Sequence, residues 1–532
     1  MFGSPSQSKL RFAAAMLVVA SAAFAAAPAG AQQRGGTLNS VVNPEPPMLI
    51  LGLNPLLPTQ LVAGKIYQGL LRYGFDLKPL PSLAKSWTIS PDGKTYTFEL
   101  ERNVKWHDGK PFTAEDVVFT LDVMLKEVHA RWRSMHDRSE SIKAIGDYTV
   151  EIKLKEAFSA FIYAFLPVGA PMMPKHIYAG SDFRNNPANT TPIGTGPFKL
   201  KEWKRGSYIH LVRNDEYWKP GKPYLDEIYY FVIPDGAQRA AALESGRVDM
   251  VQNNDIEPFD VERLAKLTQF EFATSGPESV SPVSWLDVNL RSAPFSDRRF
   301  RQALMHAIDR EFIVKNLFFG IGKPASGPIA TTTKFHDAAA VKRYPHDPAK
   351  AIALLEDMGL KPDARGIRAR VKLLNLPYGE VWTRQSEFVK QQLARVGIEV
   401  TIETVDTATW AQRNANWDFD LSFNFLSQFM HPAVGVARAY ISSNIRKGVI
   451  STNVMGYDNK EVDRLFAAAA TATTDAEAQK SYSAVQAIIT EDVPVIYLTE
   501  LQFPVFISKK FKNVIVDGNG PLSEFDEAYL VK

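Results

Sequence analysis

The side chains of this chain that are capable of covalent chemistry form none of the common catalytic patterns. The sequence contains no GxxxxGK[ST] phosphate loop, no HExxH zinc motif and no GxSxG nucleophile elbow, and it has no cysteine. Its nine histidines lack the spacing of metal ligands. His107 beside Asp108 has the composition of an acid-base pair, but a surface or capping role in a turn is the simpler interpretation. We therefore expect no enzyme activity, no metal site and no cofactor.

A ligand-binding protein needs other features, namely rigid domains, a hinge, and a cleft lined by aromatic faces and a few fixed polar groups. Aromatic residues make up 11% of the chain. Most aromatic side chains belong to the core of any globular protein, so this share permits a binding site without locating one. The positions of the aromatic residues are therefore more informative than their number.

The N-terminus has the pattern of a secretory signal peptide. Lys9 and Arg11 precede an apolar run over residues 12–27, and Ala29-Gly30-Ala31 supplies the small residues that signal peptidase requires. We expect a cleaved signal peptide of residues 1–31, because the apolar run is shorter than the roughly 20 residues that span a bilayer. An uncleaved membrane anchor is the alternative. The absence of cysteine rules out a lipid-bearing cysteine, so the sequence predicts a freely diffusing periplasmic protein that is not a lipoprotein.

Charge argues against two classes of partner. The full chain has 61 basic and 58 acidic residues, and loss of Lys9 and Arg11 with the signal peptide lowers its net charge from +3 to +1. Binding to nucleic acid or to anionic lipid needs clustered positive charge, and no cluster stands out along the sequence. We expect no nucleic-acid partner and a monomer. The mature length is typical of about three domains.

A strand, two glycine turns and a capped helix follow one another between Trp87 and Thr120. Pro91-Asp92-Gly93 is a turn sequence, and polar and apolar residues alternate from Thr95 to Leu100 as in a half-buried strand. After a second turn at residues 107–111, Thr113 can cap a helix that carries acidic residues in its first turn. The pattern predicts a hairpin followed by a helix.

Other stretches predict further elements. The apolar spacing of residues 61–73 is typical of a helix, and Ser296 is positioned to cap another helix. From Asp347 onward, helices alternate with strands such as Val371–Leu376. This βαβ order indicates a separate α/β domain.

The stretch from Trp87 to Thr120 closely resembles the corresponding part of family 5 extracellular solute-binding proteins, the peptide, oligopeptide and nickel cluster. These proteins are the soluble capture components of bacterial ABC importers. Further blocks that are similar to this family cover nearly the whole mature chain: GTGPFKLKEW, RNDEYWKPGKPYLDEI, ALESGRVDM, APFSDRRFRQALMHAIDREFIV, DPAKAIALLEDMGL, QQLARVGIEV and GYDNKEVDRLF.

The resemblance implies an α/β, two-lobed periplasmic binding protein fold of type II, similar to cluster C, with an extra subdomain in the N-terminal lobe. Two chain crossings would form the hinge. The expected boundaries after the signal peptide are residues 32–75, 190–285 and 499–532 for lobe 1, residues 76–189 for the extra subdomain, and residues 286–498 for lobe 2.

The ligand anchors of the dipeptide-binding relatives are missing. The resemblance implies an arginine for the peptide carboxylate in an Arg-Pro-Tyr sequence, and Leu376-Pro377-Tyr378 stands here instead. It implies an aspartate for the peptide amine in an acidic loop after a DFD-like strand, yet residues 421–436 after Asp418-Phe419-Asp420 contain no acid. Burying a charged terminus without its partner costs several kcal/mol. We therefore expect a ligand other than a zwitterionic dipeptide held in the usual way.

These departures locate the candidate site. Residues 425–431 are aromatic, thioether and neutral polar, which favours an apolar, aromatic or glycan-like ligand. Relatives also bring a loop to the ligand near Glu45. The predicted ligand-binding residues are Glu45, Met48, Trp285, Tyr378, Trp382, Trp410, Phe425, Gln428, Phe429 and His431. Arg384, Arg413 and Arg438 remain alternatives for binding a carboxylate, with a surface or interlobe role as the other interpretation.

The predicted function is capture of a small ligand between two lobes and its delivery to an ABC transporter permease in the inner membrane. One alternative keeps the class and changes the cargo to a peptide held mainly through backbone hydrogen bonds. An alternative of another class is a periplasmic hydrolase or chaperone on the same scaffold.

Overall fold

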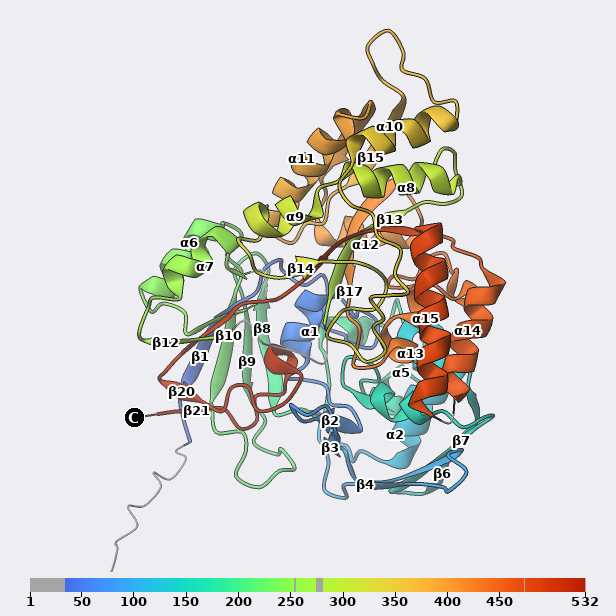
Figure 1. The fold of residues 1–532 in the computed structure, drawn as a ribbon. Helices are drawn as coiled ribbons and strands as arrows, with labels where there is room; N and C mark the ends of the chain where they lie inside the picture. The colour runs from blue at the N-terminus through green and yellow to red at the C-terminus, as the bar shows by residue number, and fades with distance from the viewer. Residues whose placement is uncertain (1–33, 253–254, 274–280, 473, 532) are drawn as a thin grey trace, which may run out of the picture.

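The computed structural model describes residues 34–252, 255–273, 281–472 and 474–531, so the predicted signal peptide lies outside the described residues. β-Sheets of seven, six and four strands organise this part of the chain (Figure 1). We call the part built on the seven-stranded sheet lobe 1, the part built on the six-stranded sheet lobe 2, and the part with the four-stranded sheet the subdomain.

Lobe 1 collects its strands from distant parts of the chain. The sheet has the order β12-β19-β11-β1-β10-β9-β8, and β1 lies parallel to β10 and β11 near its centre. Val41 of β1 and Phe506 of β19 are buried together with α6 and α7, so a C-terminal strand belongs to the interior of this lobe. The elements are β1 (Thr37–Val41), α1 (Leu57–Ala63), β8 (Phe198–Lys204), β9 (Tyr208–Arg213), β10 (Glu227–Phe231), α6 (Gly236–Glu244), β11 (Met250–Gln252), α7 (Pro258–Leu264), β12 (Phe270–Ala273) and β19 (Val505–Ser508).

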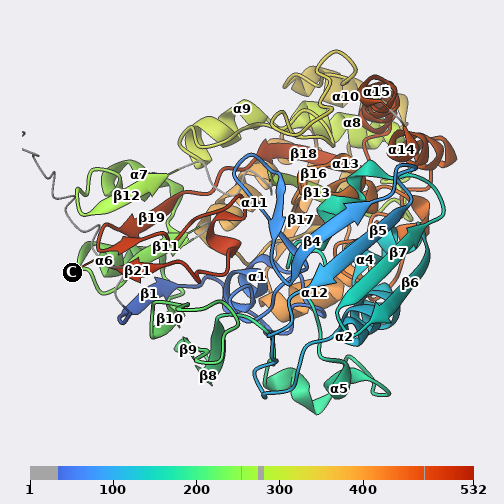
Figure 2. The same cartoon turned by 90° about the horizontal axis from the view of Figure 1, so that it is seen from below.

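The subdomain contains the predicted hairpin and capped helix. Gly93 has a φ of +69° in the turn between β4 and β5, and the Thr113 amide donates to the Asp116 carboxylate at 3.0 Å as α2 begins. Figure 2 shows the antiparallel sheet β4-β5-β7-β6 along one side of the molecule, beside α2 and α4. The elements are β4 (Ala84–Ile89), β5 (Thr95–Leu100), α2 (Ala114–Val118), a π-helical turn (Phe119–Met124), α3 (Leu125–Val128), α4 (Ala130–His136), β6 (Ser139–Gly146), β7 (Thr149–Leu154) and α5 (Lys175–Tyr178).

Lobe 2 has a mixed sheet of order β14-β18-β13-β17-β15-β16. Strand β15 lies parallel to β16 and β17, and the helices α11 and α12 connect them in the predicted βαβ order. The elements are β13 (Val283–Val288), α8 (Arg298–Ala307), α9 (Arg310–Phe312), β14 (Lys323–Pro324), α10 (Pro348–Asp357), β15 (Ala369–Leu374), α11 (Glu380–Ala394), β16 (Ile398–Glu403), α12 (Thr407–Ala415), β17 (Leu421–Leu426), α13 (Pro432–Gly435), α14 (Lys460–Thr471), α15 (Asp475–Asp492) and β18 (Val495–Glu500). Short sheets also pair β2 (Leu71–Tyr73) with β3 (Pro79–Pro81) and β20 (Phe511–Lys512) with β21 (Tyr529–Leu530).

The chain passes between the sheets of the two lobes after β12 and again after β18. The boundary expected at residues 285 and 286 falls inside β13, which lies wholly in the lobe 2 sheet from Val283 onward. The second passage covers residues 501–504, between β18 and β19. The Leu501 amide donates to the Pro282 carbonyl at 2.8 Å, so the two passages are hydrogen-bonded to each other.

Two local predictions were wrong. Helix α1 ends at Ala63, although the apolar spacing predicted a helix through residue 73. A Cβ on Gly64 would lie 2.7 Å from the Leu522 carbonyl oxygen, so the chain there is shaped by close contact with the C-terminal segment. Helix α8 is capped by Asp297, whose side chain accepts from the Arg299 amide, rather than by Ser296.

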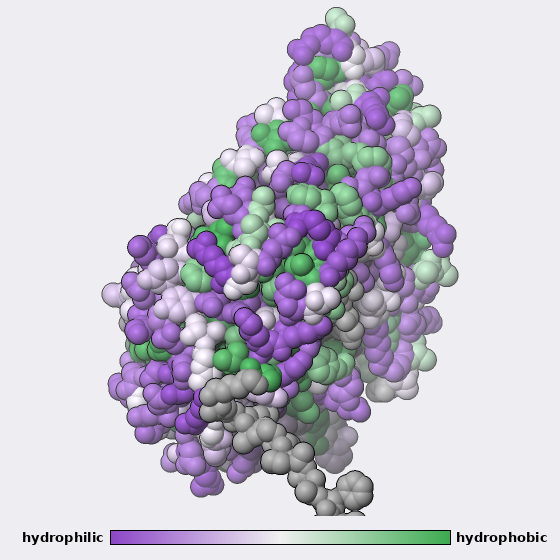
Figure 3. Space-filling view, turned by 90° about the vertical axis from the view of Figure 1, so that its left-hand side faces the viewer, coloured by the Kyte–Doolittle hydropathy of each residue, from purple (hydrophilic) through white to green (hydrophobic). Residues whose placement is uncertain are grey.

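The surface of lobe 1 is largely hydrophilic on the face that Figure 3 shows. Hydrophobic residues there are scattered in small groups among polar ones. Among the described residues, no helix is long and apolar enough to cross a membrane.

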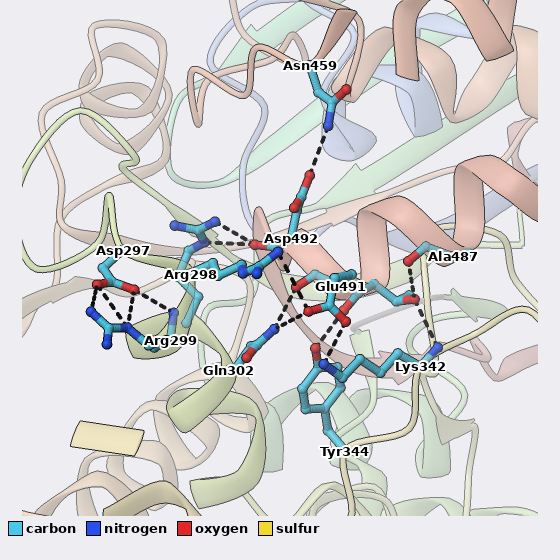
Figure 4. A network of polar contacts seen from close by, with 12 residues as sticks. Asp297, Arg298, Arg299, Gln302, Lys342, Tyr344, Asn459, Ala487, Glu491 and Asp492 are labelled. Carbon is cyan, nitrogen blue, oxygen red and sulfur yellow. Dashed lines mark hydrogen bonds and ion pairs between the residues drawn. The ribbon is translucent and has the colours of Figure 1, made fainter. Parts of the chain in front are cut away.

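A polar network fixes the C-terminal end of α15, directly before β18 leads out of lobe 2. Figure 4 shows Gln302 and Lys342 directed at Glu491, and Asn459 directed at Asp492. The guanidinium of Arg301 is buried in the same region and donates to the carbonyls of Asp492 and Val493, and also to those of residues 295 and 296. One side chain therefore joins the start of α8 to the end of α15.

Arg301→Met should lower the free energy of unfolding by roughly 3–5 kcal/mol, because it leaves several buried carbonyls without their charged donor. Denaturant unfolding followed by circular dichroism measures the change. Arg298→Gln is the matched control on the same helix, since Arg298 is more than half exposed and pairs with Glu491 at 3.7 Å. Its effect should stay below about 1 kcal/mol. Equal effects of the two variants would contradict the structural role given to Arg301.

Candidate ligand-binding site

A cavity of about 40 Å³ lies between the lobes and is lined by residues of both. Lobe 1 contributes the start of α1 with Leu56, Leu57 and Gln60, the subdomain contributes Arg131 from α4, and lobe 2 contributes the remaining wall. A cavity of this size holds a few water molecules or a small chemical group. Opening and closing of the lobes would therefore change access to it directly.

A wider pocket of about 320 Å³ adjoins the cavity and shares Pro55 and Ile450 with it. Its lining includes Met48, the helix α12 and Arg184 of the subdomain. No described residue that lines the cavity or the wider pocket is acidic, whereas three of them are arginines. Together the two spaces have the volume of a small-molecule site.

Three aromatic side chains of lobe 2 form one wall of the cavity. Tyr378 follows β15, Trp410 lies on α12, and Phe425 lies on β17. The Tyr378 ring centroid is 6.4 Å from that of Trp410 and 6.0 Å from that of Phe425. The indole Nε1 of Trp410 is buried and has no hydrogen-bond partner among the described residues. The wall therefore offers flat apolar faces and one free donor.

A buried carboxylate holds the polar side chains behind this wall. Asp287 accepts from the indole of Trp285 at 2.6 Å, from the amide of Asn414 at 3.0 Å and from the amide of Asn424 at 2.9 Å. Burial raises the pKa of Asp287 to about 6, against the opposing effect of these three donors. Asn414 and Asn424 line the cavity, so Asp287 orients two polar groups that face it.

Two buried arginines line the cavity, one from the subdomain and one from lobe 2. Arg131 is on α4 of the subdomain, and Arg438 follows α13 in lobe 2; they are 5% and 2% exposed. The Nη1 of Arg131 donates to the Val168 carbonyl and that of Arg438 to the Ser451 carbonyl. Among the described residues neither guanidinium forms an ion pair, and the Nε of each has no hydrogen-bond partner. Burial lowers the pKa of Arg438 to about 9.

The predicted site residues separate into two groups. Tyr378, Trp410 and Phe425 line the cavity, and Met48 lines the adjoining pocket. Glu45 lies at the rim of a third, more superficial pocket, where its carboxylate accepts from the Trp203 indole at 2.7 Å. The structure thus brings four of the ten predicted residues to the cavity and the pocket that adjoins it.

The other five predicted residues contribute to packing. Trp285 and Trp382 are fully buried in lobe 2, where Trp382 stacks on Phe425. Phe429 packs into the core shared by lobe 1 and the subdomain, where its ring covers the Arg131 guanidinium at 3.5 Å. His431 caps α13, where its ring accepts a hydrogen bond from the Ala433 amide. The side chain of Gln428 accepts a hydrogen bond from the Ala330 amide.

Sequence reasoning missed Arg131 and left Arg438 as one of three candidates. Arg384 pairs with Glu380 on the surface of α11, and Arg413 pairs with Glu403 and Asp418. Arg438 is the candidate that lines the cavity. The sequence around Arg131 gives no signal of its burial. Arg133 stands two positions away on the same helix, and nothing in the sequence distinguishes the two arginines.

Glu257 connects the two lobes at a second place. Its carboxylate accepts from the fully buried Arg239 at 3.0 Å within lobe 1. It also accepts from the amides of Glu380 and Val381, at 3.1 and 3.2 Å, where α11 of lobe 2 begins. The negative charge therefore caps the positive end of a helix in the other lobe.

The described residues contain no group of three or more His, Cys, Asp or Glu side chains that could hold a metal ion.

Comparison with known proteins decides the family. Residues 78–446 match the family model for "Bacterial extracellular solute-binding proteins, family 5 Middle". The chain belongs to this family. The oligopeptide-binding protein AppA of Bacillus subtilis is 32% identical over 82% of this chain and 81% of its own sequence. This match confirms the resemblance read from the sequence.

Solved structures of family members confirm the two-lobed α/β fold. AppA in complex with a nonapeptide superposes with a TM-score of 0.84 at 28% identity, covering 94% of this chain and all of that one. AgaA of A. tumefaciens R10 in complex with agropinic acid gives a TM-score of 0.82 at 26% identity, covering 93% of this chain and 99% of AgaA. The glutathione-binding protein GsiB of Escherichia coli K12 is 29% identical over 83% of this chain and 84% of its own.

Glu257→Gln should lower the free energy of unfolding by roughly 3–5 kcal/mol, because it leaves the buried Arg239 without its counter-charge. It should also shift the lobes towards an open arrangement, seen as a larger radius of gyration in small-angle X-ray scattering. Glu262→Gln on the same helix is the control, since that side chain is almost fully exposed and pairs only with Lys266 at 3.1 Å. An unchanged radius with intact stability would contradict the connecting role of Glu257.

Asp287→Asn should remove a pH dependence of stability. Because burial raises the pKa of Asp287 from its ordinary value near 3.8 to about 6, the folded state binds its proton more tightly than the unfolded state. This residue therefore makes folding less favourable as pH rises from about 4 to 6, by at most about 3 kcal/mol. Urea unfolding of both proteins across this range measures the difference between them. A difference that stays constant with pH would contradict the assignment.

Proposed function

We propose that the mature protein captures a small solute between its lobes in the periplasm and delivers it to the membrane permease of an ABC importer. The observation that carries this proposal is a cavity walled by both lobes and the subdomain. A ligand held there contacts all three parts at once, so it binds the closed arrangement better than the open one. The permease would recognise the closed form, and no covalent step is part of this function.

The ligand that we propose is not a zwitterionic dipeptide held in the usual way. Leu376, which stands where the resemblance implies a carboxylate-binding arginine, lines the cavity with an apolar side chain. The described lining of the cavity and the adjoining pocket also offers no acid to a peptide amine. Proteins similar to this one have names or solved complexes that refer to oligopeptides, glutathione and agropinic acid, which supports a scaffold with variable cargo.

Mass spectrometry of the solute released from gently purified protein by denaturation is the direct test. We expect one small compound or a narrow class of compounds, in a ratio near one to one. Recovery of mixed dipeptides and tripeptides would overturn the exclusion of ordinary peptides. Conversion of the solute to a product by the folded protein would favour the hydrolase alternative.

Trp410→Ala and Tyr378→Ala should each weaken binding of that solute at least about tenfold, because buried aromatic faces in a cleft supply much of the binding energy. Isothermal titration calorimetry below the unfolding temperature of each variant measures the affinity. Trp87→Ala is the control, because Trp87 lies on β4 of the subdomain and lines none of the cavities described above. Unchanged affinity in both cavity variants would show that the ligand binds elsewhere.

A further inference from the structure

We propose that the cavity holds the carboxylate of a small organic anion between Arg131 and Arg438, with the uncharged body of the ligand in the adjoining pocket. This inference rests on the proposed function and names the chemical class of its solute. Four observations carry it: the free edges of the two guanidiniums, the charge of the lining, the additional donors nearby, and the division of space between cavity and pocket.

Each arginine presents the same unused edge. The Nη1 of Arg131 and that of Arg438 are occupied by main-chain carbonyls, at 2.5 and 2.6 Å. These bonds fix the two guanidiniums in place and leave the Nε–Nη2 edge, whose Nε is without a partner in the described chain. Phe429 covers a face of the Arg131 guanidinium and not its edge. That edge forms two parallel hydrogen bonds with a planar carboxylate.

The charge of the cavity is uncompensated. Neither guanidinium has a carboxylate partner in the described residues, and the lining of both spaces contains Arg131, Arg438 and Arg184 without an acid. Burial and the nearby charge of Arg438 lower the pKa of Arg131 well below its usual range. Guanidiniums stay protonated in proteins, so two buried positive charges face each other across the lobe boundary at a considerable cost. An anion between them removes that cost.

Further donors surround the two arginines. The Nδ1 of His129 accepts from the Trp132 amide at 3.3 Å, so the proton of a neutral imidazole lies on Nε2. That Nε2 is buried without a partner in the described structure, although His129 itself lines neither space; burial and the charges of Arg131 and Arg438 lower the pKa of His129. Trp410 lines the cavity, and its indole Nε1 is buried without a partner in the described structure. Donors without acceptors suit an acceptor-only ligand group.

The division of space assigns the two ends of the ligand. A cavity of about 40 Å³ has room for a group of the size of a carboxylate. The adjoining pocket of about 320 Å³ is lined mainly by apolar side chains, among them Met48, Leu53 and Val449. An uncharged body fits there, and Arg184 at the same pocket attracts an anion from solution.

The two arginines belong to different parts of the structure, so a bound anion would also affect closure of the lobes. Arg131 belongs to the subdomain and Arg438 to lobe 2, so closure brings like charges together and is disfavoured without a ligand. A bound carboxylate bridges the two parts and reverses the sign of this interaction. The ligand charge therefore drives the closure that the proposed function requires.

Acetate is the probe, because it fits the small cavity by itself. Thermal unfolding of ligand-free mature protein is measured in sodium acetate, in acetamide with sodium chloride, and in sodium phosphate, all at one ionic strength. Acetate should raise the melting temperature of the wild type and acetamide should not. Arg131→Gln and Arg438→Gln should each lose at least about tenfold in acetate affinity while keeping or raising their melting temperature without ligand, since each removes an unpaired buried charge.

Arg133→Gln is the matched control. Arg133 lies on the same helix as Arg131 and is similarly buried, but its guanidinium donates to the carbonyls of Lys126 and Glu127 and lines neither space. This variant should keep the acetate response of the wild type. A variant of Arg131 or Arg438 that merely disturbs the fold would instead lower the melting temperature without ligand.

Further outcomes would overturn the anion site or separate it from solute capture. Equal shifts with acetate and acetamide, or no shift of the wild type with acetate, would overturn it. A stronger response to phosphate than to acetate would assign the cavity to a phosphate group instead. If the solute released from the purified protein is neutral or cationic, the anion assignment fails while solute capture stands. If no solute binds at all and acetate still does, solute capture fails while the anion site stands.

Discussion

A buried charge is tolerated in a protein only where it meets a partner, and this constraint governs two of the contacts between lobe 2 and the rest of this structure. At one contact the charge is compensated. Arg239 is fully buried, and Glu257 neutralises it while also accepting from the first amides of α11. At the other contact it is not, because Arg131 and Arg438 face the cavity without a carboxylate in the described chain. The first contact favours closure by itself, and the second makes closure depend on what enters.

The architecture around these contacts limits how the lobes can move. The two passages of the chain are tied together by the hydrogen bond from the Leu501 amide to the Pro282 carbonyl, at the ends of the neighbouring strands β18 and β13. At one side of lobe 2, the network around Arg301 fixes the end of α15 before β18. These bonds hold the ends of β18 and α15 in place up to the residues where the chain crosses. Motion is left to the short linkers, as in hinge closure around a ligand.

The sequence predicted the elements that local chemistry controls. The turn at Gly93, the cap at Thr113 and the helix after Asp347 depend on neighbours within a few residues, and all three occur in the structure. The extent of α1 was mispredicted, and Gly64 at its end lies against Leu522, which is far away in the chain. The same limit applies to the site. The sequence identified Tyr378, Trp410 and Phe425 as aromatic residues near a departure from the family pattern, and they line the cavity. Trp285 and Trp382 are aromatic residues of the same kind, but they are buried in the core.

Leu376 and the two arginines, Arg131 and Arg438, line one cavity. The apolar Leu376 follows the end of β15, and the positive charges of the cavity come from α4 and from the turn after α13. An anchor at the end of β15 belongs to lobe 2 alone and binds equally well whether the lobes are open or closed. An anchor divided between the subdomain and lobe 2 is complete only in the closed form. A positive charge divided in this way would therefore couple recognition of the ligand to closure, which an anchor on lobe 2 alone would not do.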